Sequence, residues 1–512
     1  MTTARTLAVA LAGLDGAVVD VEADLTNSTP GFRIIGLPDK AIGEAAQRVA
    51  NACANRGAEL PRRRLTVNLS PASLPKHGSG FDVAIAVAAV ATDLDLDHAS
   101  LARTVHIGEL GLDGRLRPLP GVLPAVLAAR RAGVRHVVVP AACAPEAELV
   151  SGVHVHPAVC LADVLRLHGG RVEAAELAPV PLPDDTAERP GGADRLDLAD
   201  VIGQPEAVEA LVVAAAGGHH VLMSGPPGAG KTMLARRLPG ILPPLDDDAA
   251  LTAASIRSLA GIPVHDLDRR PPWEAPHHSA SMGALVGGGS RIVRPGAIAR
   301  ASGGVLFLDE AGEFAASALD ALRQPLESGS IAIHRAGAHA RYPARFQLVL
   351  ATNPCPCGQY GVPGGDCTCA PVAIRRYLSR LSGPLLDRID IELSLRRVSI
   401  AHRTSVEEGV VDSAAARERV RAARERTMHR LRDTPWRRNA DVPGTWLRQG
   451  PAVPPPALRR PLDAALQRGA LTLRGYDRVL RVAWTLADLA GRAALEVDDI
   501  GRALFLKRGV TA

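Results

Sequence analysis

Residues 225–232 combine glycines, a lysine and a threonine at a spacing that suits phosphate binding. The eight residues are Gly225, Pro226, Pro227, Gly228, Ala229, Gly230, Lys231 and Thr232. In such a loop the backbone N–H groups surround the phosphates, the lysine reaches the β and γ oxygens, and the threonine hydroxyl holds Mg²⁺. The motif therefore predicts that the chain binds ATP and Mg²⁺.

Two later apolar runs end in polar side chains that could complete an ATPase site. Residues 305–308 lead into Asp309 and Glu310, and residues 348–352 lead into Asn353. Neighbouring parallel strands present such residues at one edge of a sheet. We expect Asp309 to position Mg²⁺ and Glu310 to polarise the attacking water. Asn353 would sense the γ-phosphate; the alternative is an asparagine that caps the turn before Pro354.

Arg388 lies between Asp387 and Asp390 after a helical segment. An arginine in this setting is often one half of a surface ion pair. In a ring ATPase, an arginine at this position is offered to the γ-phosphate of the neighbouring subunit, which can accelerate hydrolysis by about 10³–10⁵-fold. We expect this role for Arg388.

Four cysteines follow Asn353 as two C-x-C pairs. They are Cys355, Cys357, Cys367 and Cys369. Four thiolates suit tetrahedral Zn²⁺, and the glycines between the pairs permit a tight loop. The alternatives are free thiols or two local disulfides. We expect a structural zinc site here, and we expect the remaining three cysteines to be core residues.

The elements that must position these side chains can be read from the surrounding pattern. Residues 221–224 are typical of a buried strand and residues 233–238 of a helix, which is the context that a phosphate loop requires. Strands and helices alternate through residues 197–399, so a parallel α/β sheet is expected there. Residues 400–512 are predicted to be helical, 1–171 to form a separate domain, and the proline-rich segment 172–196 to be a linker.

Composition limits the class of protein without defining its function. Hydrophobic residues make up 47% of the chain and aromatic residues only 3%, so the core must consist of alanine, leucine and valine. A net charge of +5 permits nucleic acid as a partner but does not require it. The sequence contains no uninterrupted run of 18 apolar residues, so no membrane span is predicted. The apolar start of the chain is interpreted as a first strand, and the protein as cytoplasmic.

Further segments carry a resemblance that covers nearly the whole chain. They are residues 36–40, 68–72, 201–204, 275–281, 294–296, 352–358 and 378–390. With the phosphate loop, they resemble the YifB/ComM family of magnesium-chelatase-like AAA+ ATPases. The resemblance implies an N-terminal Lon-protease-like domain with the fold of ribosomal protein S5 domain 2, a central AAA+ sheet and a C-terminal helical lid. It also implies a homo-oligomeric ring, usually a hexamer, and Arg474 as the lid arginine (sensor 2), with Arg478 and Arg481 as rivals.

The N-terminal domain resembles Lon but lacks the residues for proteolysis. A serine–lysine pair needs an amine held beside a hydroxyl. Gly80 occupies the place of the serine in the Lon-like loop 75–82, and the stretch 122–125 directly after Gly121 contains no lysine. Ser79 with Lys76 is a poor substitute because both lie in one loop. We therefore expect a scaffold or a DNA-binding platform.

Three further segments carry arginine or histidine side chains that could contact DNA or metal, and each has an alternative interpretation. Residues 329–341 predict a β-hairpin whose Arg335, His339 and Arg341 could follow phosphates; the alternative is a solvated hairpin. Residues 414–432 predict a helix rich in arginine, including Arg417, Arg421 and Arg424, interpreted as a solvated face with a DNA-facing stripe as the alternative. His277 and His278 are interpreted as loop residues rather than metal ligands.

The sequence thus predicts a ring-shaped AAA+ motor that couples ATP hydrolysis to movement on single-stranded or branched DNA. The resemblance to the ComM proteins implies helicase activity or branch migration during homologous recombination and natural transformation. Two other functions stay open. The first is a metal-insertion motor like the magnesium chelatase ATPase subunit, and the second is a chaperone-like remodelling protein.

Overall fold

The computed structural model describes most of the 512-residue chain. The described ranges are 3–36, 40–74, 76–173, 176–182, 196–289, 293–335, 338–397, 411–451, 453–508 and 510–511. At positions 40, 41, 335, 338, 339, 508, 510 and 511 only the backbone is described. Most of the predicted linker 172–196 and the predicted boundary at 399/400 lie outside these ranges, so the domain limits stay predictions.

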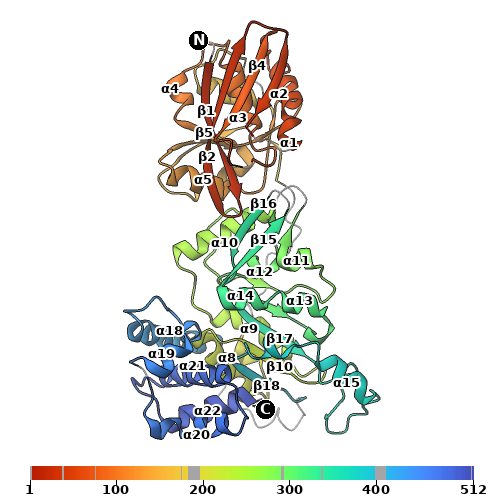
Figure 1. Ribbon diagram of the computed structural model, residues 1–512, viewed down its shortest axis with the longest axis vertical. Helices are drawn as coiled ribbons and strands as arrows, with labels where there is room; N and C mark the ends of the chain where they lie inside the picture. The colour runs from red at the N-terminus through yellow and green to blue at the C-terminus, as the bar shows by residue number, and fades with distance from the viewer. Residues whose placement is uncertain are drawn as a thin grey trace.

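The N-terminal domain is built on a seven-stranded mixed sheet with the order β3-β4-β2-β1-β5-β8-β9 (Figure 1). Its strands are β1 (Thr3–Ala12), β2 (Asp15–Thr26), β3 (Gly31–Ile35), β4 (Arg64–Ser70), β5 (Thr104–His106), β8 (His136–Pro140) and β9 (His154–Ala158). The longer helices beside it are α2 (Ala45–Ala54), α3 (Asp82–Val90), α5 (Val122–Arg131) and α7 (Leu161–Leu167). The expected first strand is confirmed, since β1 pairs along its whole length with β2.

The central domain contains a six-stranded, fully parallel sheet with the order β11-β14-β17-β10-β18-β19. Its strands are β10 (Val221–Ser224), β11 (Trp273–Glu274), β14 (Val305–Leu308), β17 (Gln347–Thr352), β18 (Ile391–Ser394) and β19 (Val510–Thr511). Every residue of β14 and β17 is buried, as expected where helices cover both faces of a parallel sheet. The predicted strand–helix alternation is therefore confirmed.

Side chains that alternate along these strands divide the core into two clusters. Val305 and Phe307 pack into a cluster shared with the C-terminal helices. Leu306 and Leu308 point to the opposite face and pack with helices and strands of the central domain. This alternation anchors the strands from both sides, so the loops at their carboxyl ends are held in fixed positions.

Helices of the central domain surround the sheet. They are α8 (Pro205–Gly217), α9 (Lys231–Ile241), α10 (Asp247–Ala260), α11 (Met282–Val286), α12 (Ala297–Arg300), α13 (Ala316–Asp320), α14 (Arg323–Ser328), α15 (Pro371–Leu378) and α16 (Gly383–Leu386). A hairpin formed by β15 (Ser330–Arg335) and β16 (Ala338–Pro343) lies between α14 and β17 in sequence, which confirms the predicted β-hairpin.

The C-terminal region is helical, as predicted, and forms the lid. Its helices are α18 (Ser413–Arg430), α19 (Gly444–Gln449), α20 (Pro456–Gln467), α21 (Leu473–Leu489) and α22 (Val497–Arg508). The lid and the central domain share one apolar cluster, and Figure 1 shows the lid helices beside α8 and α9. The final strand β19 pairs with β18, so the end of the chain returns to the central sheet.

Two arginines of α18 join the lid to the central domain. Arg417 donates to the carbonyl of Gly240 in the last turn of α9, at 2.9 and 2.7 Å. Arg424 donates to the carbonyl of Ala215 near the end of α8, at 3.2 and 2.6 Å. Cationic donors stabilise the carbonyl ends of helices, where backbone acceptors lack partners. The DNA-facing stripe is therefore not supported for these two side chains, whereas Arg421 is exposed and pairs with Glu418 and Glu425, as on a solvated face.

The N-terminal domain contacts the central domain through α10 and the hairpin. The backbone N–H of Gly121 donates to the carbonyl and the hydroxyl of Ser258 in α10, both at 3.1 Å. Gly13, between β1 and β2, forms a β-bridge with Arg341 of β16. Figure 1 shows the hairpin reaching toward the β1–β2 turn. The hairpin is thus in direct contact with the N-terminal domain.

Candidate nucleotide site and thiol cluster

The phosphate loop connects β10 to α9 at the carboxyl edge of the central sheet. Gly230 has a φ of 83° immediately before the helix, a conformation that favours glycine. The helix then begins at Lys231, so its first N–H groups face the loop. The chain therefore folds as strand, loop and helix, which is the geometry that phosphate binding requires.

Lys231 lies inside the loop. Its Nζ donates to the carbonyls of Gly225 (2.6 Å) and Pro226 (3.0 Å) and to Oδ1 of Asn353 (2.9 Å). Burial lowers the pKa of Lys231, while the nearby carboxylates of Asp309 and Glu310 oppose that shift. The lysine and Asn353, which are far apart in sequence, are thus brought into direct contact.

Thr232, which follows Lys231 in the chain, is hydrogen-bonded to Asp309. The Thr232 hydroxyl donates to Oδ2 of Asp309 at 2.6 Å, and the other carboxylate oxygen, Oδ1, accepts the backbone N–H of Glu310 at 2.9 Å. A hydroxyl and a carboxylate at this separation are the oxygen donors that Mg²⁺ prefers beside bound phosphates. The donor set therefore fits Mg²⁺.

Glu310 has an unusual backbone conformation. Its φ of 51° makes it the only non-glycine residue with positive φ in the described part of the chain. For such a residue the left-handed region costs about 1–2 kcal/mol, and strain of this kind is often retained at functional sites. Oε2 of Glu310 lies 3.0 Å from Nδ1 of His278. His278 belongs to the loop after β11, the strand next to β14.

Arg388 is not in contact with the phosphate loop of its own chain. Its side chain forms an ion pair with Glu327 of α14 and donates to the carbonyl of Pro384. The residue is only 5% exposed. Burial, and then the neighbouring cations Arg474 and Arg323, lower the pKa of Arg388. An arginine in this position could serve a neighbouring subunit only after leaving Glu327.

The three lid arginines of α21 differ in their surroundings. Arg478 donates to the carbonyl of Asp387 (2.6 Å) and pairs with Asp390 (2.7 Å), whereas Arg481 donates to the carbonyl of Val442 (2.8 Å). Arg474 is exposed at the start of the helix and lies near Arg388. The two rivals therefore have structural partners, whereas the sensor 2 role of Arg474 stays a prediction.

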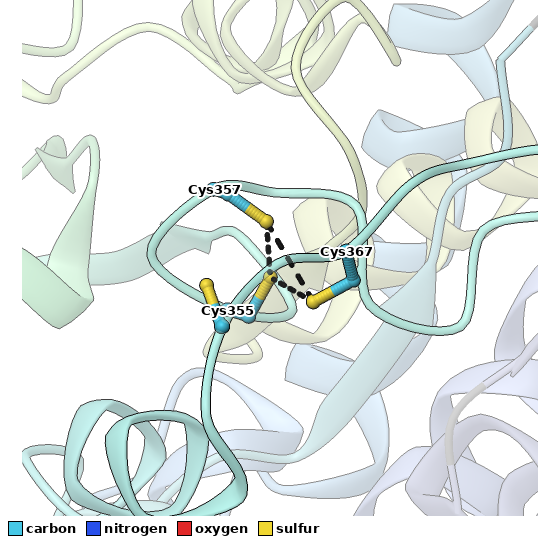
Figure 2. Close-up of side chains that lie close together, drawn as sticks. Cys355, Cys357 and Cys367 are labelled. Atoms are coloured by element: carbon cyan, nitrogen blue, oxygen red, sulfur yellow. Dashed lines mark hydrogen bonds between the residues drawn. The ribbon is translucent and has the colours of Figure 1, made fainter.

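The four cysteines converge although they are divided between two segments of one loop. Their sulfurs all lie within 4.8 Å of one another, and Figure 2 shows the labelled sulfurs pointing toward one another. The Sγ–Sγ distances are 3.4 Å for Cys355–Cys357, 3.8 Å for Cys355–Cys367 and 3.7 Å for Cys357–Cys367. A tetrahedron with Zn–S bonds of the usual length requires about 3.8 Å between sulfurs. The cluster therefore has the dimensions of a zinc site.

Local hydrogen bonds favour the thiolate at Cys357, whereas the pKa of Cys367 is raised to about 11, because the backbone N–H of Cys369 is outweighed by desolvation and the bond with Cys357. The backbone N–H of Gln359, followed by the neighbouring thiol of Cys355, lowers the pKa of Cys357 to about 6. Metal ligation requires deprotonated cysteine. The loop that carries the cysteines also lies close to the phosphate loop. Gly358 approaches Pro227 so closely that a Cβ added to Gly358 would lie 2.4 Å from Cδ of Pro227. The loop that carries the thiol cluster thus lies directly beside the phosphate loop.

The Lon-like loop does not assemble a proteolytic pair. Nζ of the fully buried Lys76 donates to the carbonyls of Gly36 (3.0 Å), Leu69 (2.9 Å) and Pro71. The Ser79 hydroxyl donates instead to Glu109. The lysine and the serine therefore have separate structural partners.

Comparison with known proteins identifies the family. Models of the magnesium chelatase subunit ChlI match residues 197–403 and 21–143, and the model of its C-terminal region matches residues 411–507. An uncharacterized protein of Mycobacterium tuberculosis is 48% identical over 516 residues, covering 99% of each chain. Competence protein ComM of Haemophilus influenzae is 42% identical over 494 residues, covering 96% of this chain and 95% of ComM. The chain belongs to the YifB/ComM family of magnesium-chelatase-like AAA+ ATPases.

The N-terminal domain has a separate similarity. The Lon protease of Mycolicibacterium smegmatis is 28% identical over 170 residues, which cover 31% of this chain and 21% of Lon. The predicted Lon-like domain is therefore confirmed as a similarity. No helix in the described ranges is both long and apolar enough to cross a membrane.

His278 is the residue that sequence reasoning missed. The sequence predicts a loop position for His278, and it does lie in a loop. The signal available in the sequence was its position a few residues after a strand that must adjoin the strand leading to Glu310. Only the folded arrangement brings the imidazole to the carboxylate.

Proposed function

We propose that the protein is a cytoplasmic, ATP-driven ring motor that acts on DNA, with helicase or branch-migration activity in homologous recombination and natural transformation. The observation that carries the ATPase part is the convergence of Lys231, Thr232, Asp309 and Asn353 at one edge of the sheet. The DNA part is supported by similarity over nearly the full length to a relative named a competence protein.

We propose the following roles for the site residues, which their geometry supports. Lys231 binds the phosphates that enter the loop, and Asn353, which contacts its Nζ, reports the presence of the γ-phosphate. Thr232 and Asp309 would hold Mg²⁺, which neutralises charge on the phosphate oxygens when bound. Glu310 accepts a hydrogen bond from the attacking water and orients it. Arg388 acts in a neighbouring subunit and Arg474 is the lid arginine (sensor 2), within a ring expected to be a hexamer.

Zinc is proposed as a structural ion in the cysteine cluster. Cys355, Cys357, Cys367 and Cys369 would hold it, and its ligation would fix the loop that follows Asn353. The four ligands leave no open position, as is usual for a structural site. We assign it no part in hydrolysis.

A metal-insertion motor is the second candidate, because all three family models describe a magnesium chelatase subunit. Against it, the 38 kDa magnesium-chelatase subunit of Acidiphilium rubrum matches only 30% of this chain. A chaperone-like remodelling function is the third.

ATP turnover by the full chain distinguishes these functions. We expect Mg²⁺-dependent hydrolysis that rises on adding single-stranded DNA or a four-way junction. Glu310→Gln should bind ATP and lose turnover by about 10²-fold or more, because the water is no longer oriented. Stimulation by an unfolded protein or by chelatase partner subunits, with none by DNA, would contradict the proposed function.

A further inference from the structure

Three histidines lie together at the β9 edge of the N-terminal sheet. β8 and β9 are parallel neighbours, and His136 of β8 is the register partner of His154 of β9. His156 lies two residues after His154, and side chains two residues apart on a strand share a face. The three imidazoles therefore project from the same face of these two strands.

The separation of two of these rings suits a single metal ion. Nδ1 of His136 lies 3.2 Å from Nε2 of His156. Two nitrogens that bind one ion through bonds of about 2.0–2.1 Å lie about 2.8–3.4 Å apart, for ligand angles between octahedral and tetrahedral. As the contact stands, one of the facing nitrogens carries the shared hydrogen. A shift of this hydrogen to the far nitrogen of its ring, with a small turn of the rings, would aim both lone pairs at one ion.

His154 can supply a third ligand. Its ring is stacked on that of His136, with centroids 5.1 Å apart and planes inclined by 23°. It must turn about its side-chain bonds to offer a nitrogen, and because it is exposed, no packing opposes this turn. In the part of the chain that the structure describes, the one hydrogen bond of these three imidazoles joins His136 to His156. No other protein group there competes with an ion for their nitrogens.

Two further histidines behind this face are already engaged. Nδ1 of His106, in β5 next to β8, lies 2.8 Å from the Thr6 hydroxyl, and its Nε2 lies 2.9 Å from Nε2 of His168. Nδ1 of His168 lies 2.9 Å from the Ser100 hydroxyl. Since all four nitrogens of these two rings have partners, neither ring can add a ligand.

A cavity beside His156 leaves room for the remaining ligands of the ion. It has a volume of about 420 Å³ and lies between β9 and α7, with His156, Val164 and Leu167 on its walls. Its cation, Arg166, is paired with Asp163 at 2.5 Å, which limits the repulsion of a metal ion. Three imidazoles and open positions that water can fill make a coordination shell that such ions commonly take.

We propose that His136, His154 and His156 bind one divalent ion of a late first-row transition metal, such as Zn²⁺, Ni²⁺ or Cu²⁺, at the edge of the N-terminal domain. Imidazole suits these ions, whereas Mg²⁺ and Ca²⁺ prefer oxygen. The ion would join the edge strand β9 to β8. The site goes beyond the proposed ATPase function, since none of its residues belongs to the nucleotide site or the thiol cluster.

Equilibrium dialysis of the full chain against Ni²⁺ tests the site. The protein carries no histidine tag, because a tag would bind the same ion. We expect the unchanged protein to take up about one more Ni²⁺ per chain than the double variant His136→Gln/His156→Gln, as one site requires. This difference is independent of any metal held by the cysteines, which both proteins retain.

Single variants make the test specific. In His136→Gln and His156→Gln the dissociation constant for Ni²⁺ should rise by about 10²-fold or more, because loss even of an outer-shell partner costs about 10–100-fold. His154→Gln should raise it by about tenfold. His98→Gln removes a histidine of the same domain outside the cluster and should bind Ni²⁺ as the unchanged protein does. Circular dichroism of each variant shows that the fold is retained.

The outcomes decide the inference without involving ATP. Equal Ni²⁺ uptake by the unchanged protein and the folded double variant overturns the site. An unchanged dissociation constant in His154→Gln overturns the assignment of three ligands. Either result leaves the proposed function untouched, because ATP turnover depends on other residues.

Discussion

Lys231 donates a hydrogen bond to Asn353 across 2.9 Å, which joins the start of α9 to the end of β17. The lysine is placed by the phosphate loop, and the asparagine by the strand next to β10 in the sheet. A ligand that draws Lys231 toward its phosphates must therefore alter the partner of Asn353. Two residues later the chain enters the thiol cluster at Cys355.

Asn353→Ala should lower ATP turnover while leaving ATP binding largely intact. Loss of one preorganised polar group at the reacting phosphate reduces kcat by about 10²-fold in comparable sites. The measurement is kcat beside the dissociation constant for a fluorescent ATP analogue. Asn68→Ala, in the N-terminal domain, is the matched control. Equal losses of binding and turnover would show that Asn353 merely holds Lys231.

Arg388→Ala should reduce ATP hydrolysis by about 10³-fold or more, as expected for the loss of an arginine that stabilises transferring phosphate. If Arg388 serves the neighbouring subunit, an equal mixture of Arg388→Ala and Lys231→Ala proteins should recover activity. Random assembly gives intact interfaces at about one position in four, so about a quarter of the unchanged rate is expected. A mixture that stays as inactive as its components would contradict action between subunits.

The unmodified protein should contain about one zinc per chain, as one Cys₄ site requires. Cys357→Ser should abolish it, and loss of the metal should lower the Tm by roughly 5 °C or more, because metal binding contributes to folding. Elemental analysis and a thermal melt provide the two readouts. Cys53→Ala removes a buried thiol from the N-terminal domain, so this variant should retain the metal. Metal-free protein from a zinc-supplied preparation would rule out the site.

Glu146 makes the stability of the joint between the domains depend on pH. Burial raises the pKa of Glu146 to about 7 from its ordinary value of 4.5, against the hydrogen bond from Ser258 of α10. Between pH 4.5 and about pH 7, Glu146 keeps its proton in the folded chain and releases it in the unfolded chain. The free energy of unfolding therefore falls as pH rises through this range, by up to about 3 kcal/mol. Below pH 4.5 both states hold the proton and the effect is absent.

Glu146→Gln removes this titration. We expect its Tm to match the unchanged protein near pH 4.5 and to exceed it by roughly 5 °C at pH 8, as the recovered free energy implies. Glu148→Gln, which removes the same charge from an exposed position two residues away, should show no such divergence. A Tm difference that is constant across the pH range would contradict the assignment.

Arg341 offers a test of DNA binding at the hairpin. Its exposed guanidinium lies on β16, where Nε and Nη2 donate to Oγ of Ser330 at 3.2 and 3.1 Å. If it contacts a phosphate, Arg341→Ala should reduce the slope of log K against log salt by about one. Arg421→Ala is the matched control, because Arg421 is engaged by Glu418 and Glu425 on the lid. Equal slopes in all three proteins would remove Arg341 from the DNA surface.

Local patterns predicted much of the fold because each one is contained in a short segment. The phosphate loop between β10 and α9, the buried strand before Asp309 and the hairpin at 330–343 are examples. The convergence of the cysteines was predictable too, since two C-x-C pairs joined by a glycine-rich loop can close on one ion. The roles of the individual site residues stay predictions.

Contacts between distant segments could not be predicted in the same way. Arg388 forms an ion pair with Glu327, and Arg417 donates to a carbonyl at the end of α9. Both contacts arise because the packing of whole helices brings the partners together. The local sequence pattern is the same for a helical arginine that faces solvent and for one that contacts the end of a neighbouring helix. The pairing of His278 with Glu310 likewise depends on strand order in the sheet, which no local pattern specifies.

The bonds from Arg417 and Arg424 to the ends of α9 and α8 have a mechanical consequence. Separation of α18 from the central domain would leave two helix-terminal carbonyls without their charged donors. A shift of α9, whose first residue is Lys231, would therefore be transmitted to α18 as a rigid displacement. Each lid would then follow the occupancy of its own subunit, and in a closed ring this would let one bound nucleotide alter the angle between adjacent subunits.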